Sequence, residues 1–192
     1  MLWQHRTRSE LRSRTAATIM IITDFETRRA WHTDADGIAL THRDSIRSIG
    51  ARFYPPDVVD AWQAGLAGEV YRRAMDAGEV FFVATSSVDQ QPLMLGFASE
   101  FCIKGSTHGA SVYVRGSAAR RGVGSALFAL AEGHALARGA SSLQIESSLA
   151  GVEFYRAHGF SEIGRGETRL LSGRPIECVF MSKSLQAAGR SR

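Results

Sequence analysis

The chain has 192 residues, of which 44% are hydrophobic and 22% charged. This composition is typical of one globular domain that is large enough to fold without metal ions or disulfides. Its apolar runs fall short of the roughly 20 residues that a helix needs to cross a bilayer, which argues against an integral membrane protein. The formal net charge of +4 raises the question of a nucleic-acid partner.

The positive charge lies at the two ends of the chain. Residues 1–19 carry a net charge of +3 and residues 184–192 a net charge of +2, which leaves residues 20–183 close to −1. A basic surface on the folded body is therefore not indicated, and the sequence argues against nucleic-acid binding.

Residues 1–19 are polar and rich in Arg and Ser. We interpret them as a disordered basic leader, with an extension upstream of a start at Met20 and a transit peptide as the alternatives. They lack the apolar stretch of a secretory signal, and we expect a cytoplasmic protein. Residues 20–184 then form one domain, and residues 185–192 a flexible tail.

The first half of this domain predicts one strand and three helices. The apolar run 19–25 is typical of a strand, and residues 33–49 have apolar side chains at helical spacing behind an N-cap at Thr33 or Asp34. Two prolines open the next helix, over 55–66, and a third helical segment ends at Gly78.

The second half predicts a mixture of strands and helices. Three short apolar runs predict an antiparallel meander, and a helix over 122–138 follows it and stops at Gly139. A strand, a short helix capped by Gly159 and two further strands complete the chain, so that the fold class is α/β with a mixed sheet. The expected strands are 80–85, 93–103, 110–115, 143–147, 160–164 and 176–185.

A glycine-containing turn lies between the meander and the long helix. Gly122 and Gly124 allow a tight turn, so that several backbone N–H groups can converge at the helix N-terminus and bind a pyrophosphate. A plain helix entry is the structural alternative. The segment lacks the lysine of a Walker loop, and it has Leu127 where a dinucleotide fingerprint requires a third glycine.

A second candidate is Tyr155, on the short helix that follows strand 143–147. A tyrosine stays protonated at neutral pH, with an ordinary pKa of about 10, and can therefore give a proton to a departing thiolate. The alternative is a tyrosine that only packs the helix onto the sheet. The helix begins at the carboxyl end of its strand, where open sheets bind ligands.

Three motifs together resemble the GNAT superfamily of acyl-CoA-dependent N-acetyltransferases. The segment Ala119-Arg-Arg-Gly122-Val-Gly124 is similar to the family's pyrophosphate loop, and Phe154-Tyr155-Arg-Ala-His-Gly159-Phe160 is similar to its helix–strand signature. The strand ending Val112-Tyr113-Val114 matches a third element. The order of elements agrees from about residue 20 to residue 184.

The resemblance implies a single-domain, GNAT-like fold with a splayed mixed sheet flanked by helices. Acetyl-CoA would lie between strands 110–115 and 143–147, and an amine would attack its thioester directly while Tyr155 protonates the leaving thiolate. A backbone N–H of the splayed strand could polarise the thioester carbonyl. The cofactor-binding residues would be Val112, Tyr113, Val114, Arg120, Arg121, Gly122, Val123, Gly124, Ser125, Ser148 and Phe154.

The chain departs from the family pattern at three positions. Ala119 stands where the family often has Arg or Gln, and Ser148 and Gly151 replace Asn and Ala ahead of the Phe-Tyr pair. The alternatives to an acetyltransferase are transfer of a longer acyl group and a non-catalytic sensor of acyl-CoA.

The general base has three candidates. His108 stands where family members often carry Glu, and Glu100 and Glu146 lie at strand ends. We interpret His42 as a packed histidine with a satisfied partner and His158 as a contact of its helix C-terminus. No group of residues has metal-ligand spacing, so we expect no metal.

The acceptor pocket of such folds is built from the first two helices and their connection. Phe53, Tyr54 and Trp62 are candidate walls for a small-molecule or peptide amine. They could equally be ordinary core residues. Exposed edge strands leave a homodimer open. Cys102 and Cys178 lie in apolar runs and are expected to be two buried thiols.

Overall fold

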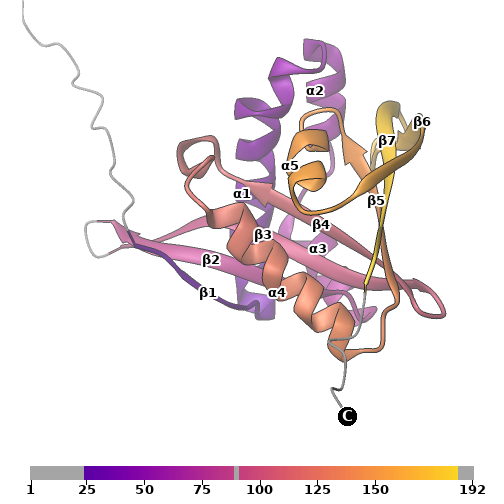
Figure 1. The fold of residues 1–192 in the computed structure, drawn as a ribbon. Helices are drawn as coiled ribbons and strands as arrows, with labels where there is room; N and C mark the ends of the chain where they lie inside the picture. The colour runs from indigo at the N-terminus through magenta and orange to yellow at the C-terminus, as the bar shows by residue number, and fades with distance from the viewer. Residues whose placement is uncertain (1–23, 89–90, 186–192) are drawn as a thin grey trace, which may run out of the picture.

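The computed structural model describes residues 24–88 and 91–185. The basic leader, the C-terminal tail after Leu185 and most of the strand expected over 19–25 lie outside these residues. Helices flank a seven-stranded sheet with the order β1-β2-β3-β4-β5-β7-β6, which confirms the expected fold class (Figure 1). The strands are Glu26–Arg29 (β1), Val80–Val88 (β2), Gln91–Lys104 (β3), Thr107–Val114 (β4), Ser142–Ser148 (β5), Ser161–Arg169 (β6) and Pro175–Ser184 (β7).

The helices begin and end close to the positions that the sequence predicts. Gly78 and Gly139 both have positive φ, +96° and +81°, as expected of residues that end helices in the left-handed region. The helices are Ala35–Ser48 (α1), Pro56–Gln63 (α2), Gly68–Asp76 (α3), Val123–Ala137 (α4) and Val152–Ala157 (α5), with short 3₁₀ turns at 32–34, 50–52 and 116–118.

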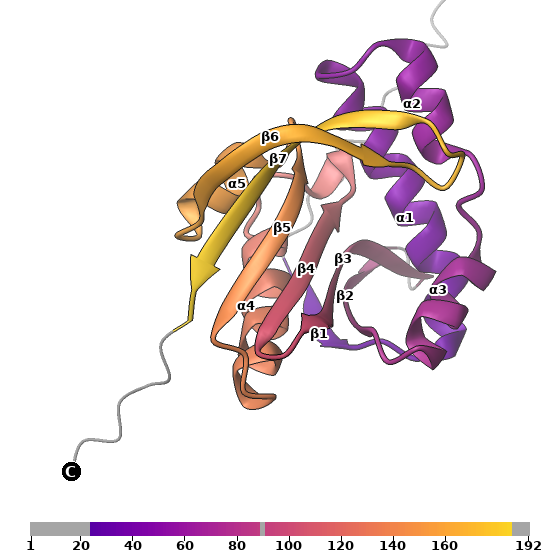
Figure 2. The same cartoon turned by 90° about the vertical axis from the view of Figure 1, so that its right-hand side faces the viewer.

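Two layers of helices cover the sheet. α4 packs on one face of β2, β3 and β4, through side chains such as Leu95, Leu127 and Ala131. α1, α2 and α3 pack on the other face, through Ile38, Trp62 and Phe97 among others. Figure 2 shows the β6–β7 hairpin arching from the sheet toward α2.

The sheet pairing is antiparallel between all neighbours except β4 and β5. These two parallel strands pair over only three residues, with Thr107–Gly109 opposite Ser142–Gln144. β5 continues along β7 as far as Ser148, while β4 continues along β3 as far as Val114. The two halves of the sheet therefore separate toward the C-terminal ends of β4 and β5.

The two cysteines differ from the sequence interpretation in one respect. Both are free thiols and Cys178 is buried, but Cys102 is exposed near the end of β3. β3 extends to Lys104, beyond the part of the strand that helices cover, and its last four residues are all exposed. Among the helices of the described residues, none combines the length and hydropathy that crossing a bilayer requires.

Candidate functional site

The opening between β4 and β5 contains a polar contact between β4 and α5, the helix that follows β5. The backbone N–H of Val112 donates a hydrogen bond to the Tyr155 hydroxyl across 3.2 Å. Arg115 N–H donates to Leu95 of β3 at 2.8 Å, so the N–H groups of Val112 and Val114 face the opposite side, toward the opening. Strand β4 therefore presents backbone hydrogen-bonding groups to the space between the strands.

Tyr155 is held rigidly beside this opening. Its side chain is 5% exposed and packs against the rings of Phe128 and Phe160. Burial, with the nearby Tyr113 hydroxyl, raises the pKa of Tyr155 well above its ordinary value, and the Val112 N–H offsets only part of this effect. The phenol is therefore protonated throughout the neutral and mildly basic range.

The turn into α4 has the geometry of an anion cradle. Gly122 has φ +82° and precedes the first helical bond, from Ala126 N–H to Gly122 C=O at 3.0 Å. The N–H groups of Val123, Gly124 and Ser125 lie in the first helical turn, ahead of any intrahelical acceptor. Arg120 also has a positive φ, +63°, which is uncommon for a residue with a side chain.

Close contacts fix this turn against α5. A Cβ at Gly124 would lie 3.1 Å from the Phe154 ring, and the Ser125 hydroxyl lies 3.1 Å from Nε2 of His158. His158 Nδ1 lies 2.7 Å from the Phe154 carbonyl oxygen, so this histidine contacts the end of its own helix. Of the predicted cofactor-binding residues, Val123 is buried in the core and offers only its backbone.

Asp44 of α1 anchors the segment before the turn, a role that no local sequence pattern predicts. Its carboxylate accepts hydrogen bonds from the Gly116 N–H at 3.0 Å and from the Arg115 guanidinium at 3.4 Å. Arg115 also donates to the Met94 carbonyl at 2.6 Å. The two bonds to Asp44 join residues more than 70 positions apart, and only the fold brings them together.

Gly151 and Ser148, the two departures from the family pattern near α5, lie in different surroundings. A Cβ at Gly151 would lie 2.9 Å from the Ser147 hydroxyl and 3.2 Å from the Tyr155 ring, so glycine fits the close approach of Tyr155. Ser148 lies beside the opening and lines a cavity on the α1 face of the sheet.

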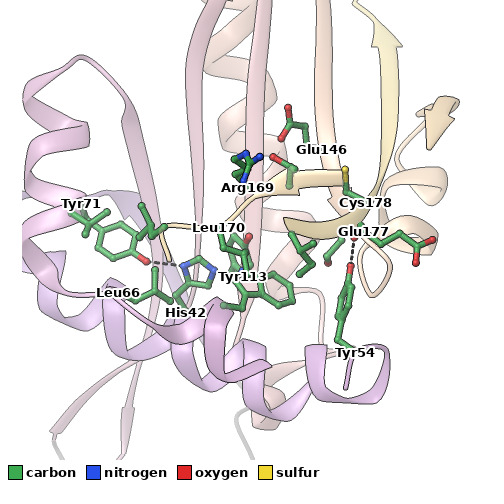
Figure 3. Close-up of a pocket in the computed structure, with 16 residues that line it drawn as sticks. His42, Tyr54, Leu66, Tyr71, Tyr113, Glu146, Arg169, Leu170, Glu177 and Cys178 are labelled. Atoms are coloured by element: carbon green, nitrogen blue, oxygen red, sulfur yellow. Dashed lines mark hydrogen bonds between the residues drawn. The ribbon is translucent and has the colours of Figure 1, made fainter. Parts of the chain in front are cut away.

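This cavity has a volume of about 320 Å³ and lies between α1, α3 and the β6–β7 hairpin (Figure 3). Its walls include Tyr113, at the end of β4, and Ser148, at the end of β5, so the cavity borders the opening between the strands. Burial raises the pKa of Tyr113 to about 12. Tyr155 approaches the same opening from α5, where it packs with the core of the α4 face.

Of the three residues predicted to bind the acceptor, two line the cavity. Tyr54 accepts a hydrogen bond from the Leu149 N–H at 2.8 Å and donates one to the Glu177 carbonyl at 2.7 Å, and Trp62 packs edge-on against it. Phe53 is 49% exposed and does not line the cavity.

The hairpin closes the far side of the cavity. Thr168, Arg169, Leu170 and Leu171 of β6 and its turn all contribute to the walls. The hairpin is held in place by Arg174, which contacts the Asp57 carboxylate of α2 at 2.6 Å. The sequence did not predict this wall.

The three candidates for the general base lie in two separate places. Glu146 of β5 lines the cavity and is exposed to it. Glu100 and His108 lie on the α4 face, where the two side chains are hydrogen-bonded to each other. Glu100 is fully buried and also contacts His134 Nδ1 at 2.6 Å and Arg138 at 3.6 Å.

His42 also lines the cavity, and here the sequence interpretation is half right. Nδ1 of this buried histidine lies 2.7 Å from the Tyr71 hydroxyl, as expected of a satisfied packed residue. Nε2 has no hydrogen-bond partner in the described part of the chain, which the sequence did not predict. Within the same residues, no group of His, Cys, Asp and Glu is arranged to hold a metal ion.

Comparisons with known proteins agree with this geometry. A family model described as an acetyltransferase (GNAT) domain matches residues 51–185. A crystal structure from Rhodopseudomonas palustris, described as a GCN5-related N-acetyltransferase, is 27% identical with a TM-score of 0.70, over 86% of this chain and 99% of that one. No curated protein matches the chain.

Two more distant structures share the fold and carry a cofactor. The PaiA N-acetyltransferase of Thermoplasma acidophilum, in complex with coenzyme A, is 18% identical with a TM-score of 0.65, over 84% of this chain and 99% of that one. A phosphinothricin acetyltransferase from Sinorhizobium meliloti, in complex with AcCoA, is 20% identical with a TM-score of 0.60, over 84% of this chain and 88% of that one.

Proposed function

Because the chain belongs to the GNAT acetyltransferase family, we propose that it transfers an acetyl group from acetyl-CoA to a primary amine, with Tyr155 as the general acid. The observation that carries this proposal is the hydrogen bond between the Tyr155 hydroxyl and Val112 N–H, inside the opening between β4 and β5. A protonated phenol inside this opening supports a role for Tyr155 in giving a proton to the sulfur of a bound thioester as it leaves. We propose the cytoplasm as the cellular location of the protein.

The residues around the opening fit acetyl-CoA. Gly122 has open space where a Cβ would stand, and the N–H groups of the first turn of α4 can donate hydrogen bonds to a pyrophosphate there. Backbone groups of Val112 and Val114 face the opening and can bind an extended arm as a neighbouring strand would. Related structures in complex with coenzyme A or AcCoA support the same placement.

The acceptor amine would occupy the cavity on the α1 face. This arrangement puts the amine on one side of the opening and Tyr155 on the other, so that attack and departure occur on opposite sides of the reacting carbonyl. Glu146 is one of two glutamates in the cavity wall, with Glu177, and we propose Glu146 as the base that takes the ammonium proton, directly or through water. Acetyl-CoA supplies the activated acyl group.

Glu100 and His108 are assigned a structural role instead. Both are buried against α4, where the two Glu100 oxygens are hydrogen-bonded to Nδ1 of His108 and Nδ1 of His134. A general base must reach the proton that it removes, or be linked to it by water. Neither residue lines the cavity.

The first test is calorimetric titration of the full chain with acetyl-CoA, with CoA and dephospho-CoA as controls, followed by turnover with a panel of amines. Binding with CoA release that depends on an amine supports the proposal. Binding without turnover of any amine would favour an acyl-CoA sensor, and faster turnover of longer acyl-CoA thioesters would favour a longer acyl donor. A folded sample that binds no acetyl-CoA would refute the proposal.

A further inference from the structure

The His42 side chain is an unused hydrogen-bonding group in the wall of the cavity. The residue is only 9% exposed, and its Nε2 has no partner in the part of the chain that the structure describes. Its other ring nitrogen, Nδ1, lies 2.7 Å from the Tyr71 hydroxyl of α3 (Figure 3). A buried polar atom without a partner costs free energy, so a bound ligand that satisfies it gains affinity.

Aromatic side chains surround this imidazole. The ring of Tyr113 lies 3.7 Å from that of His42 between centroids, and the ring of Phe97 lies at 5.6 Å. Burial among them lowers the pKa of His42 to about 3, so the imidazole is neutral at physiological pH. A neutral imidazole has one N–H donor and one lone-pair acceptor, on different nitrogens.

The contact with Tyr71 favours one of the two neutral tautomers of the His42 ring. Burial raises the pKa of Tyr71, so its hydroxyl keeps its proton. In the described residues the Tyr71 hydroxyl forms its hydrogen bond with Nδ1 of His42. The hydroxyl can donate its proton in this bond when Nδ1 is the unprotonated ring nitrogen. The ring proton is then on Nε2, and this N–H needs an acceptor atom from a ligand.

The charged groups of the cavity limit what that ligand can be. Glu146 attracts an ammonium group and disfavours a second carboxylate. Arg169, the cation of the same wall, is exposed and donates to the Gly173 carbonyl at 3.0 Å. Beside His42, the lining residues Leu66, Tyr71 and Tyr113 carry no positive charge, and the nearby Arg43 guanidinium already donates to the Leu66 carbonyl. The desolvation of a buried anion there would be costly.

We infer that the acceptor is a primary amine that also carries an uncharged oxygen, such as an amide or hydroxyl oxygen, which accepts a hydrogen bond from His42 Nε2–H. This inference rests on the proposed acetylation of an amine in the same cavity. His42 then determines specificity, and Tyr71 positions its proton.

The test compares matched ligands that differ only at the end remote from the amine. One series carries a primary amide, the second an isopropyl group of the same shape, and the third a carboxylate, with the linker to the amine varied in length. Binding to the full chain is measured by calorimetry in the presence of CoA, so that no acetyl transfer occurs. Acetylation of the same compounds is measured separately with acetyl-CoA.

With the wild-type protein, the best amide should bind roughly tenfold more tightly than its isopropyl partner, as expected of one hydrogen bond to a buried group. It should also bind more tightly than its carboxylate partner. His42→Phe should abolish the amide preference, so that the two affinities differ by a factor of about 1, because the ring stays and the donor is lost. His42→Gln keeps a donor near the position of Nε2 and should retain part of the preference.

Nitrogen NMR of the wild-type imidazole tests the same inference without a substitution. The expected spectrum is that of a neutral ring protonated on Nε2, with the Nε2 signal shifting when the amide binds. Protonation on Nδ1, equal binding of amide and isopropyl ligands, or an unchanged preference in His42→Phe would each overturn the inference. If all three series are acetylated without preference, this inference is refuted and the proposed function stands. If amides bind selectively but are not acetylated, the proposed function is refuted and this inference about binding stands.

Discussion

The Tyr155 hydroxyl lies 3.2 Å from the amide nitrogen of Val112, so α5 is bonded to β4 across the opening where β4 and β5 separate. This contact spans 43 residues in the sequence. It fixes a phenol whose pKa is raised by burial at the point where β4 presents backbone N–H groups to the opening.

Tyr155→Phe should lower kcat by about 10²–10⁴-fold, the range typical of losing a general acid. The phenyl ring keeps the packing against Phe128 and Phe160, so acetyl-CoA affinity should stay near that of the wild type. Steady-state kinetics and calorimetry measure the two quantities. A large loss of affinity with unchanged kcat would make Tyr155 a packing residue only.

The turn into α4 allows a matched set of glycine variants. Gly124→Val should abolish acetyl-CoA binding, because even a Cβ would lie 3.1 Å from the Phe154 ring and the added methyl groups would displace α5 or the turn. The control is Gly133→Ala in the same helix, where a Cβ meets nothing within 4 Å. It should leave binding unchanged and stabilise the protein by up to about 1 kcal/mol. Normal binding by Gly124→Val would refute the pyrophosphate assignment.

Glu146→Gln should lower kcat/KM by about 10²-fold or more and change its pH profile, since the amide cannot accept the ammonium proton. Acetyl-CoA binding should be retained. Glu177→Gln is the matched control, because this second glutamate of the lining bonds Tyr54 through its backbone carbonyl while its side chain points away from the cavity (Figure 3). Equal effects of the two substitutions would argue for general electrostatics rather than a base.

Glu100→Gln should destabilise the fold by about 3–5 kcal/mol, as expected when one member of a buried ionic cluster is changed. His108, His134 and Arg138 all face the Glu100 carboxylate, and an amide cannot accept from all of them. Denaturant unfolding measures the loss, and kinetics below the melting range should show an unchanged pH profile. A shifted profile with normal stability would restore Glu100 and His108 as base candidates.

The buried His42 should make stability depend on pH. Its pKa is about 3 in the folded protein, against an ordinary value of about 6.5, so below pH 6.5 the unfolded chain binds a proton that the folded protein excludes. The free energy of unfolding should therefore fall as the pH drops below 6.5, by about 1.4 kcal/mol per pH unit from this residue. Urea unfolding from pH 6.5 to 5 should show a shallower slope for His42→Phe.

The control for this slope is His32→Gln, which changes an exposed histidine outside the core. It should leave the pH dependence as in the wild type. If His42→Phe and the wild type lose stability in parallel, His42 is accessible to protons in the folded state.

The sequence predicted those helices, turns and motifs that a local pattern of residues encodes. Gly122, Gly124 and the Phe154-Tyr155 pair are adjacent in the chain, and the turn chemistry that they encode does not depend on distant residues. The helices were predicted from the spacing of apolar side chains, which burial on one face requires.

The remaining features depend on which face of the sheet each side chain occupies. Glu100 pairs with Ala110 in the β3–β4 ladder, so Glu100 and His108 share the face that α4 covers. The sequence could not supply this pairing. The contact of His42 with Tyr71 and the hairpin wall of the cavity also join distant segments, and nothing in their local sequences distinguishes them from ordinary core or turn residues.

The β6–β7 hairpin forms a wall of the proposed acceptor cavity and is separate from the turn proposed to bind the acyl donor. This separation affects how the selectivity of the protein can change. The wall made by residues 168–171 is one contiguous segment near the C-terminus, whereas the turn at 120–125 belongs to a separate element. Substitutions at such separated sites have nearly additive effects. Exchanging this short hairpin segment between paralogues should therefore transfer acceptor preference as a unit while leaving the use of the acyl donor intact.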